Sequence, residues 1–375
     1  MIKKRRFLQN ILTFLILVIT IFFQLKYIKD NKGLFQEEFN PTIHKNLYSQ
    51  SQYVMENPKS VIPDEIVYAH SAWEYLHGTD PIMLNAEQPP LGKYLIGLSE
   101  LWFDNSRFTG PIFNFAILIA LYLLANTILE SRFLSSIIVL IFSFEKLFIA
   151  QVRYSPTLDN IQVAFILFSL YFFIKAVFKK KIPYMSLVFL GLVVSTKFWI
   201  TGIVLYLTYL TFIVFSKNRK RIYNFLVFSP IVGIVNLVSY LPSFIFHDLS
   251  LIRYIGLQKY IYVWHSGKLQ PNFIAPFDLL LFNKWHHSGT IIPSVDWQIT
   301  WPVITLISLI GIAYTVYRFK NIDLKILLLN LYIFFYMGLL IFSDTNARYM
   351  FPLVPILYIA CVWNIKRLII WYNKE

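Results

Sequence analysis

The residues best suited to chemistry lie between positions 63 and 100, in a polar stretch flanked by strongly apolar segments. This stretch holds six acids, among them the pair Asp64-Glu65 and, further on, Glu87 just ahead of the run Gln-Pro-Pro-Leu-Gly-Lys that ends at Lys93. A carboxylate can take a proton from a hydroxyl group, and a lysine can hold a phosphate. Because the Pro-Pro pair stiffens the backbone, Glu87 and Lys93 would be fixed near the membrane surface, which suits contact with an anionic lipid head group.

Structural roles remain open for the same residues. Asp64 and Glu65 follow a proline, and acids in the first turn of a helix complement its dipole. Glu87 could be an exposed turn acid and Lys93 a solvated charge on a helix at the membrane surface. These alternatives would place the residues on a folded loop without giving them any part in chemistry.

The composition indicates a membrane protein. Hydrophobic residues make up 57% of the 375 residues and charged residues only 14%, whereas soluble domains carry about 25% charged residues. The net charge of +14 lies in short basic clusters between apolar runs, so anionic lipid and membrane topology explain it and no nucleic acid partner is expected. The single cysteine, Cys361, excludes an intrachain disulfide and suggests no cysteine-based metal site.

The apolar runs predict an all-α, polytopic protein in which residues 1–375 form one transmembrane domain. The first run is predicted to be a retained span, since no small-residue cleavage pattern follows it. The sequence predicts about ten spans, at Phe7–Phe23, Phe108–Leu129, Phe133–Ala150, Ile161–Phe178, Tyr184–Trp199, Ile200–Phe215, Ile222–Phe246, Thr300–Tyr317, Leu324–Phe342 and Phe351–Ile365.

The basic clusters predict the orientation of these spans. With the N-terminus in the cytoplasm, every cluster falls on the cytoplasmic side, at positions 3–6, 179–181, 217–221, 318–325 and 366–367. In a plasma membrane this leaves outside a long first loop at 28–107, a second segment at 247–299 and three short loops. Apolar residues at helical spacing predict two amphipathic helices in the first loop, near residues 69–76 and 91–101. All candidate functional residues would therefore face the same compartment.

The motifs Asp64-Glu65 and Glu87-Gln-Pro-Pro-Leu-Gly-Lys93 resemble the first external loop of the GT-C membrane glycosyltransferases, above all the protein O-mannosyltransferases. The resemblance extends over most of the chain, roughly from Val61 to Pro355. It departs at Gln88, where the family commonly has His, and the segment 247–299 is far too short for the β-rich domain of eukaryotic members. The chain therefore looks like a minimal prokaryotic form.

The later family motifs match at positions that the predicted topology places outside. They carry the residues Arg153 and Asp159, Thr196-Lys197 with Gly202, His265, Trp297 ahead of Trp301-Pro302, and Arg348. Arg153 and Lys197 could instead be interfacial cations that snorkel, and the tryptophans could belong to the aromatic belt of the membrane.

The resemblance implies a GT-C fold and inverting transfer of a hexose, mannose above all, from a polyprenyl- or dolichyl-phosphate sugar to a hydroxyl on protein. It implies Asp64 as the general base and Glu65 as an acceptor-positioning acid. Donor and phosphate binding fall to Glu87, Lys93, Arg153, Asp159, Lys197 and Arg348, and His265 and Trp297 are candidate contacts to sugar or acceptor.

Other functions remain open. The acceptor could be a glycolipid or a cell-wall polymer, as in the related aminoarabinose transferases, and a flippase for a lipid-linked sugar is a further alternative. Charged residues gather at the predicted external ends of spans and not at mid-span, which favours surface chemistry over transport. No cofactor is firmly predicted, because the adjacent pair His286-His287 is a weak pattern for a divalent metal. Oligomeric state is not readable from the sequence.

Overall fold

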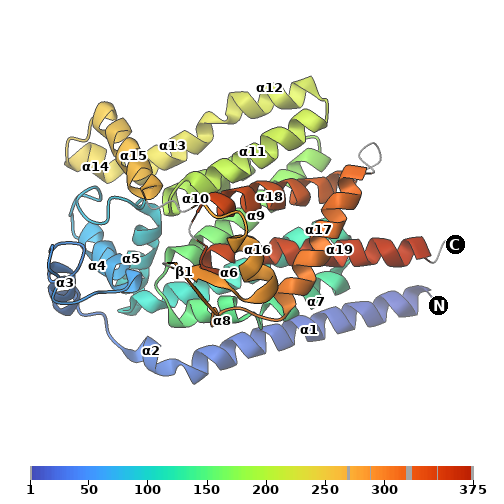
Figure 1. Cartoon of the computed structure of the whole chain (residues 1–375), viewed down its shortest axis with the longest axis horizontal. Coiled ribbons are helices and arrows are strands. Elements are labelled where there is room, and N and C mark those ends of the chain that lie inside the picture. The colour runs from blue at the N-terminus through green and yellow to red at the C-terminus, as the bar shows by residue number, and fades with distance from the viewer. Residues whose placement is uncertain (1, 268–270, 288, 318–322, 344, 373–375) are drawn as a thin grey trace.

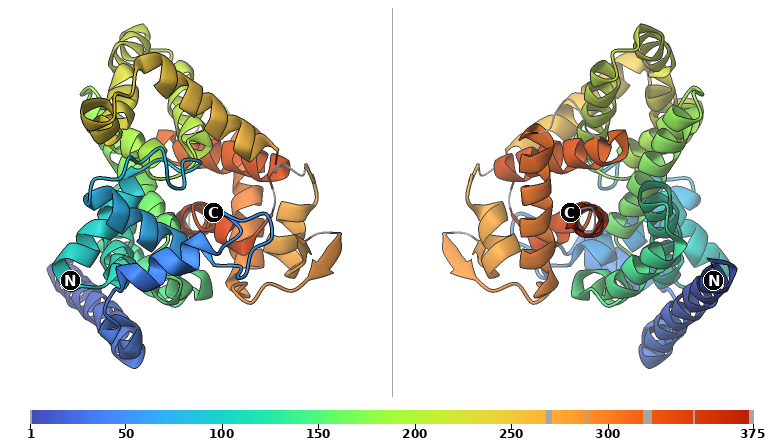
Figure 2. Two further views of the ribbon diagram at one scale, coloured as in Figure 1. Left: turned by 90° about the vertical axis from the view of Figure 1, so that its left-hand side faces the viewer. Right: turned by 90° about the vertical axis from the view of Figure 1, so that its right-hand side faces the viewer.

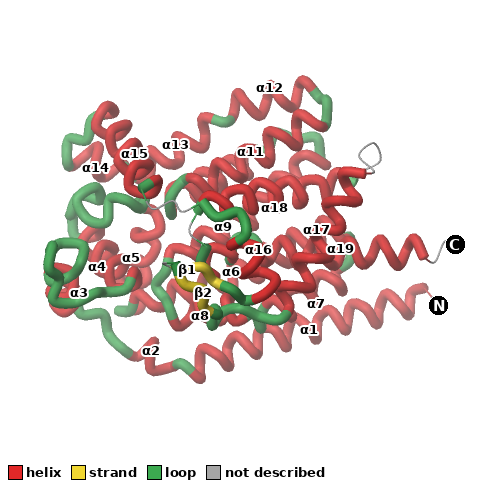
Figure 3. The backbone as a smooth tube through the Cα atoms, in the orientation of Figure 1, coloured by secondary structure: helices red, strands yellow, loops and turns green. Residues whose placement is uncertain are grey.

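A computed structural model describes residues 2–267, 271–287, 289–317, 323–343 and 345–372 of the chain. The fold is almost entirely helical, with one small β-hairpin (Figure 3). Both termini lie at one end of an elongated helical bundle, and the helices α3, α4, α5, α14 and α15 gather at the opposite end (Figure 1). The structure thus separates the segments predicted to be cytoplasmic from the segment predicted to be the first external loop. The basic run 318–325 lies partly outside the described residues.

The elements of the first half are α1 (Ile2–Asp30), α2 (Lys32–Gln36), α3 (Pro41–Ser49), α4 (Asp64–Leu76), α5 (Leu91–Phe103), η1 (Ser106–Phe108), α6 (Thr109–Leu129), α7 (Arg132–Phe142), α8 (Lys146–Arg153), α9 (Leu158–Phe178) and α10 (Tyr184–Thr196).

The elements of the second half are α11 (Ile200–Phe215), α12 (Arg219–Phe228), α13 (Pro230–Ser239), α14 (Leu241–Phe246), α15 (Leu251–Ser266), α16 (Ala275–Phe282), β1 (Trp285–His287), β2 (Thr290–Ile292), α17 (Thr300–Tyr317), α18 (Leu324–Phe342), η3 (Ala347–Met350) and α19 (Val354–Tyr372). The two strands pair antiparallel.

The core of the bundle forms around α9, which packs against α6 and α10. Viewed along the long axis, α19 lies near the centre of the bundle and α1 lies at its edge, where it packs on α7 (Figure 2). This difference follows the sequence. The residues of α19 from Val354 to Cys361 are all buried, whereas α1 exposes large apolar side chains such as Phe14 and Phe22 and only 17% of its apolar stretch is buried. Such a helix suits contact with lipid.

The prediction of about ten spans is not confirmed. Among the described residues six helices are long and apolar enough to cross a membrane, or up to seven if the bent pair α7 and α8 is one span. The predicted span at 133–150 bends by 58° between those two helices, and α10 and α11 are short apolar helices of 13 and 16 residues. The predicted span at 222–246 is divided among α12, α13 and α14.

Both helices predicted in the first external loop are present, as α4 and α5, and they pack against each other. Asp64 and Glu65 form the first turn of α4, and Pro89-Pro90 precedes α5. Gly92 brings α5 close to two other helices. A Cβ atom at this position would lie 2.5 Å from Leu158 Cδ2 and 3.0 Å from Thr196 Cγ2. The motif glycine therefore allows α5 to touch the residues directly before Asp159 and Lys197.

Candidate active site

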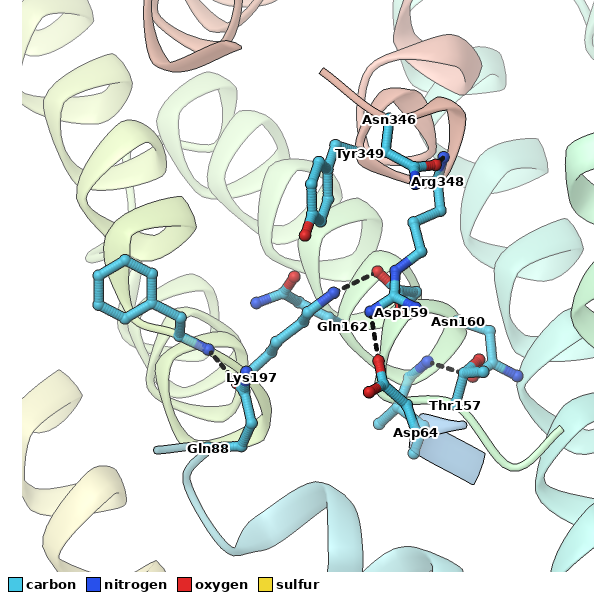
Figure 4. Close-up of polar contacts among 12 residues, drawn as sticks. Asp64, Gln88, Thr157, Asp159, Asn160, Gln162, Lys197, Asn346, Arg348 and Tyr349 are labelled. Carbon is cyan, nitrogen blue, oxygen red and sulfur yellow. Dashed lines mark hydrogen bonds and ion pairs between the residues drawn. The ribbon is translucent and has the colours of Figure 1, made fainter. Parts of the chain in front are cut away.

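Four charged side chains from distant parts of the sequence meet at the start of α4 (Figure 4). Lys197 Nζ lies 2.5 Å from Asp159 Oδ1, and Arg348 Nη2 lies 2.7 Å from Asp64 Oδ2. Arg348 Nε lies 3.7 Å from Asp159 Oδ2, so the arginine joins the two pairs. We call Asp64, Asp159, Lys197 and Arg348 the ion-pair cluster. All four residues were candidates from the sequence.

The cluster forms at the ends of helices. Asp159 is the second residue of α9, and Lys197 lies in the extended break between α10 and α11. Arg348 belongs to η3, whose first turn is held by the Asn346 side chain accepting from the Arg348 backbone N–H at 3.1 Å. Asp64 begins α4. Side chains at helix ends can converge without being sealed inside the bundle.

The two ends of the cluster differ in exposure. The Asp159 and Lys197 side chains are 7% and 12% exposed, whereas those of Asp64 and Arg348 are 30% and 34% exposed. Partial burial strengthens charge-assisted hydrogen bonds. The exposed pair, Asp64 and Arg348, can contact a ligand. The buried pair, Asp159 and Lys197, supports the exposed pair.

Asp64 has a second partner that the sequence did not reveal. The Tyr53 hydroxyl donates to Asp64 Oδ1 at 3.2 Å. Tyr53 lies in the loop before α4, which is closed by Gln52, because its side-chain amide exchanges two hydrogen bonds with the backbone of Ile62. No periodicity or motif marks Tyr53, and only the loop closure places it over Asp64.

Glu65 lies beside Asp64 and is partly buried, and it forms no ion pair with Arg348. Removal from water raises the pKa of the Glu65 carboxyl, and the negative charge of Asp64 raises it further. A carboxylate oxygen can accept a hydrogen bond from a hydroxyl group. This suits a residue that orients a hydroxyl group.

Tyr349 covers the cationic side of the cluster. Lys197 Nζ lies 5.5 Å from the centre of the Tyr349 ring, and the guanidinium carbon of Arg348 lies 5.9 Å from it. The Tyr336 hydroxyl donates to the Tyr349 backbone carbonyl at 2.9 Å and so fixes its place. Cation–π contact helps to hold two like charges near each other. Sequence reasoning missed Tyr349, although it directly follows the motif arginine.

Lys93 lies apart from the ion-pair cluster, although the resemblance grouped it with Lys197 and Arg348 for phosphate binding. It is fully buried, and its ammonium group donates to Asn85 O at 2.7 Å, Asn85 Oδ1 at 3.2 Å and Gln88 O at 2.9 Å. Burial lowers the pKa of Lys93 to about 7. Because all three donors are used within the loop, Lys93 shapes the Pro-Pro corner.

The corner in turn supports the turn that carries Lys197. Gln88 Oε1 accepts a hydrogen bond from the Phe198 backbone N–H at 3.0 Å. His265 of α15 lies 3.0 Å from the Glu87 carbonyl through Nε2 and stacks on the Phe198 ring at 4.0 Å. The Glu87 side chain accepts from Asn85 at 2.6 Å and is buried. Glu87 and His265 therefore contact this support and not the ion-pair cluster.

The structure does not bring Arg153 or Trp297 to the cluster. Arg153 is exposed at the end of α8 and lies 5.8 Å from the ring of Tyr27 in α1. The indole N–H of Trp297 lies 3.4 Å from the Leu280 carbonyl, and its ring packs against the apolar core. Arg153 thus has the environment of an interfacial cation.

No group of three potential metal ligands occurs among the His, Cys, Asp and Glu residues that the structure describes. His286 Nε2 lies 2.8 Å from Asp278 Oδ2, and the His287 ring lies 4.6 Å from that of Trp285. This part of the chain forms the hairpin and its contact with α16, apart from the ion-pair cluster.

Comparison with solved structures reveals the fold. ArnT from Cupriavidus metallidurans in the apo state superposes with a TM-score of 0.57 at 14% identity, over 82% of this chain and 55% of that one. The chain has a GT-C fold. The same enzyme bound to undecaprenyl phosphate gives a TM-score of 0.56 at 14% identity, over 82% of this chain and 56% of that one. The chain spans about half the length of these relatives.

A second GT-C protein matches over nearly the whole chain. The apo oligosaccharyltransferase of Archaeoglobus fulgidus superposes with a TM-score of 0.56 at 13% identity, over 96% of this chain and 51% of that one. The family model of dolichyl-phosphate-mannose-protein mannosyltransferases matches residues 87–246. No curated protein matches in sequence. The predicted resemblance to the GT-C superfamily and to the protein mannosyltransferases is thereby confirmed.

Proposed function

We propose that this protein is an inverting glycosyltransferase that moves a hexose from a polyprenyl- or dolichyl-phosphate sugar to a hydroxyl group at the external membrane face. The observation that carries the proposal is the ion-pair cluster, in which a partly exposed carboxylate and an arginine lie together at the end of a buried acid–lysine pair. A glycosyl phosphate needs both a proton acceptor and cations for the leaving phosphate.

In the proposed reaction the acceptor oxygen attacks the anomeric carbon as the bond from that carbon to the phosphate oxygen breaks. Asp64 takes the acceptor proton, and the polyprenyl phosphate leaves with the electron pair of the broken bond. Arg348 and Lys197 stabilise the charge that grows on the phosphate, and Asp159 keeps both cations in place. Glu65 orients the acceptor hydroxyl. Attack from the face opposite the phosphate inverts the anomeric configuration.

An apolar cavity of about 400 Å³ favours a lipid carrier as the donor, because it could hold part of an isoprene chain. It lies between α10, α11, α13 and α15 and is lined by Trp199, which follows Lys197 by two residues, and by Gly233 of α13. Two GT-C relatives have been solved with lipid phosphates bound, one with undecaprenyl phosphate and one with an inhibitory peptide and a dolichol-phosphate. We assign the first isoprene units of the carrier to this cavity and its phosphate to the ion-pair cluster.

Mannose as the sugar and protein as the acceptor rest on the resemblance to the mannosyltransferase family over residues 87–246. The external location rests on the basic clusters, because the N-terminus, the connection between α11 and α12 and the C-terminus all lie at the end away from α4 and α5 (Figure 1). In a plasma membrane with that end in the cytoplasm, the cluster faces outward. A lipid-linked donor suits this side, since nucleotide sugars are confined to the cytoplasm.

The direct test is transfer by the purified full chain. Labelled polyprenyl-phosphate mannose and other polyprenyl-phosphate hexoses are mixed with a pool of peptides and glycolipids, and label should appear on peptide hydroxyl groups with inverted anomeric configuration. Label on glycolipid would reassign the acceptor. Movement of the donor across vesicle membranes without any transfer would replace the proposal by transport.

Lys197→Gln is expected to raise the donor concentration needed and to lower the transfer rate by about 10²-fold, because the leaving phosphate gains charge in the transition state. Arg153→Gln is the matched control and should leave both quantities unchanged, since Arg153 at the end of α8 faces Tyr27 of α1 and not the cluster. Steady-state kinetics with thermal melting as a folding check would measure this. Equal loss in the two variants would contradict the assignment of the phosphate to the cluster.

Gly233→Leu should raise the KM for a long-chain donor several-fold. The backbone has room for the change, because a Cβ at Gly233 meets no atom within 4 Å, and the added side chain fills the cavity. Gly338→Leu in α18 is the control, with equal room for a Cβ but no place in the cavity lining. A donor with one short prenyl chain should be less affected. Equal KM values for Gly233→Leu and Gly338→Leu would remove the carrier from this cavity.

A further inference from the structure

Arg348 serves both acids of the ion-pair cluster. It lies 2.7 Å from Asp64 and 3.7 Å from Asp159, while Lys197 contacts Asp159 alone. The cluster therefore contains equal numbers of acids and cations. A phosphate that enters it adds negative charge to a balanced set, so at least one existing ion pair must weaken as the new one forms.

The two acids differ in what the loss of Arg348 would cost them. Asp159 is buried and keeps Lys197 at 2.5 Å, so it stays paired. Asp64 would keep only the neutral Tyr53 hydroxyl, but its side chain is 30% exposed and water can solvate it. Separating a buried pair is far more costly than separating a partly exposed one. The pair that yields is therefore Arg348–Asp64.

We propose that the phosphate of the lipid carrier and the Asp64 carboxylate compete for Arg348. Binding of the carrier draws the guanidinium from Asp64 Oδ2, and the freed lone pair can then take the acceptor proton. After transfer, Asp64 passes its proton to water, which its partly exposed side chain can reach, and the recharged carboxylate recaptures Arg348 and so assists release of the lipid phosphate. This inference rests on the proposed function and adds an order to it, in which the donor binds before the acceptor is activated.

If the lipid phosphate and Asp64 compete for Arg348, a prediction follows that general-base catalysis by Asp64 does not give. Asp64→Asn removes the competitor, so the purified full chain should bind undecaprenyl phosphate about fivefold or more tightly, in the range typical of coupled sites. Glu65→Gln is the matched control. It removes an adjacent carboxylate that forms no ion pair with Arg348, so its affinity should stay close to that of the unchanged protein. Titration calorimetry in detergent measures the affinity of the unchanged protein, of Asp64→Asn and of Glu65→Gln for undecaprenyl phosphate.

Two further variants guard against a general effect of charge or a folding defect. On an Arg348→Gln background, Asp64→Asn should give no gain, because the shared cation is absent. Tyr53→Phe keeps every charge but leaves Asp64 more dependent on Arg348, so it should weaken binding of undecaprenyl phosphate. This variant tests the competition even if Asp64→Asn does not fold.

The outcomes separate the competition from the proposed function. Equal gains in Asp64→Asn and Glu65→Gln would overturn the competition in favour of long-range electrostatics, as would an affinity of Asp64→Asn no higher than that of the unchanged protein. In both cases the unchanged protein still binds the lipid phosphate and still transfers sugar. Absence of both binding and transfer in the unchanged protein would overturn the proposed function itself, and the competition with it.

Discussion

Asp64→Asn is expected to lower turnover by about 10²- to 10⁴-fold, the typical contribution of a general base, while donor binding survives. The amide keeps the size of the side chain and can still accept from the Tyr53 hydroxyl, but it cannot take a proton. The transfer rate at saturating donor and acceptor measures the effect. Because binding is retained, the loss should appear in kcat.

The control for this experiment is Asp104→Asn. Asp104 lies in the same predicted external loop, is exposed, and has a positive φ of 50° that asparagine also tolerates. It should retain full turnover. If Asp64 only complements the dipole of α4, the change at Asp64 should cost about 1 kcal/mol or less of stability and leave turnover intact. Near-normal turnover in Asp64→Asn would therefore remove it as the base.

The four members of the ion-pair cluster could be named from the sequence because each belongs to a family motif. The predicted topology also places all four on the same side of the membrane. Contact among them could not be deduced. A separation of 284 positions lies between Asp64 and Arg348, and their approach depends on the tertiary packing that brings the start of α4 to η3. Gly92 is the part of this packing that the motif did encode, since it allows α5 to touch the residues before Asp159 and Lys197.

Lys93 and Arg153 show where sequence reasoning fell short. Both are cations at predicted external positions, so topology alone could not distinguish them from Lys197. Lys93 is buried by the corner that it holds, and a pattern of residue types does not reveal which carbonyls a lysine will meet. Arg153 ends α8, and the 58° bend between α7 and α8 sets its direction toward α1. Ser143, Glu145 and Lys146 interrupt the apolar run at the bend, but such an interruption does not give the angle between the two helices.

The same limitation explains where a predicted span breaks. Residues 222–246 are apolar enough for one long helix, yet Pro230 and Pro242 lie near the starts of α13 and α14, where proline is tolerated. Hydropathy records the total apolar length but not where a helix ends. The amphipathic helices of the first loop were easier to predict, because polar residues on one face mark their period and prolines mark their starts.

Asp159→Asn should be the most destabilising single change in the cluster. Asp159 is buried and accepts from Lys197 at 2.5 Å, with Arg348 at 3.7 Å, so an amide would leave two partly buried cations without their shared anion. Breaking a buried pair in this way costs about 3–5 kcal/mol. Thermal unfolding of the detergent-solubilised protein should show a large drop in Tm.

Two controls identify the cause of that drop. Glu130→Gln breaks an ion pair with Lys325 whose glutamate side chain is 72% exposed, and it should cost about 1 kcal/mol or less. Adding Lys197→Gln to Asp159→Asn removes the unpaired cation, so the double variant should be less destabilised than the sum of the single changes by about 0.5–3 kcal/mol. A loss in Asp159→Asn as small as that in Glu130→Gln would mean that the buried half of the cluster does not hold the site together. The positions of Arg348 and Lys197 would then depend on the helices around them and not on Asp159.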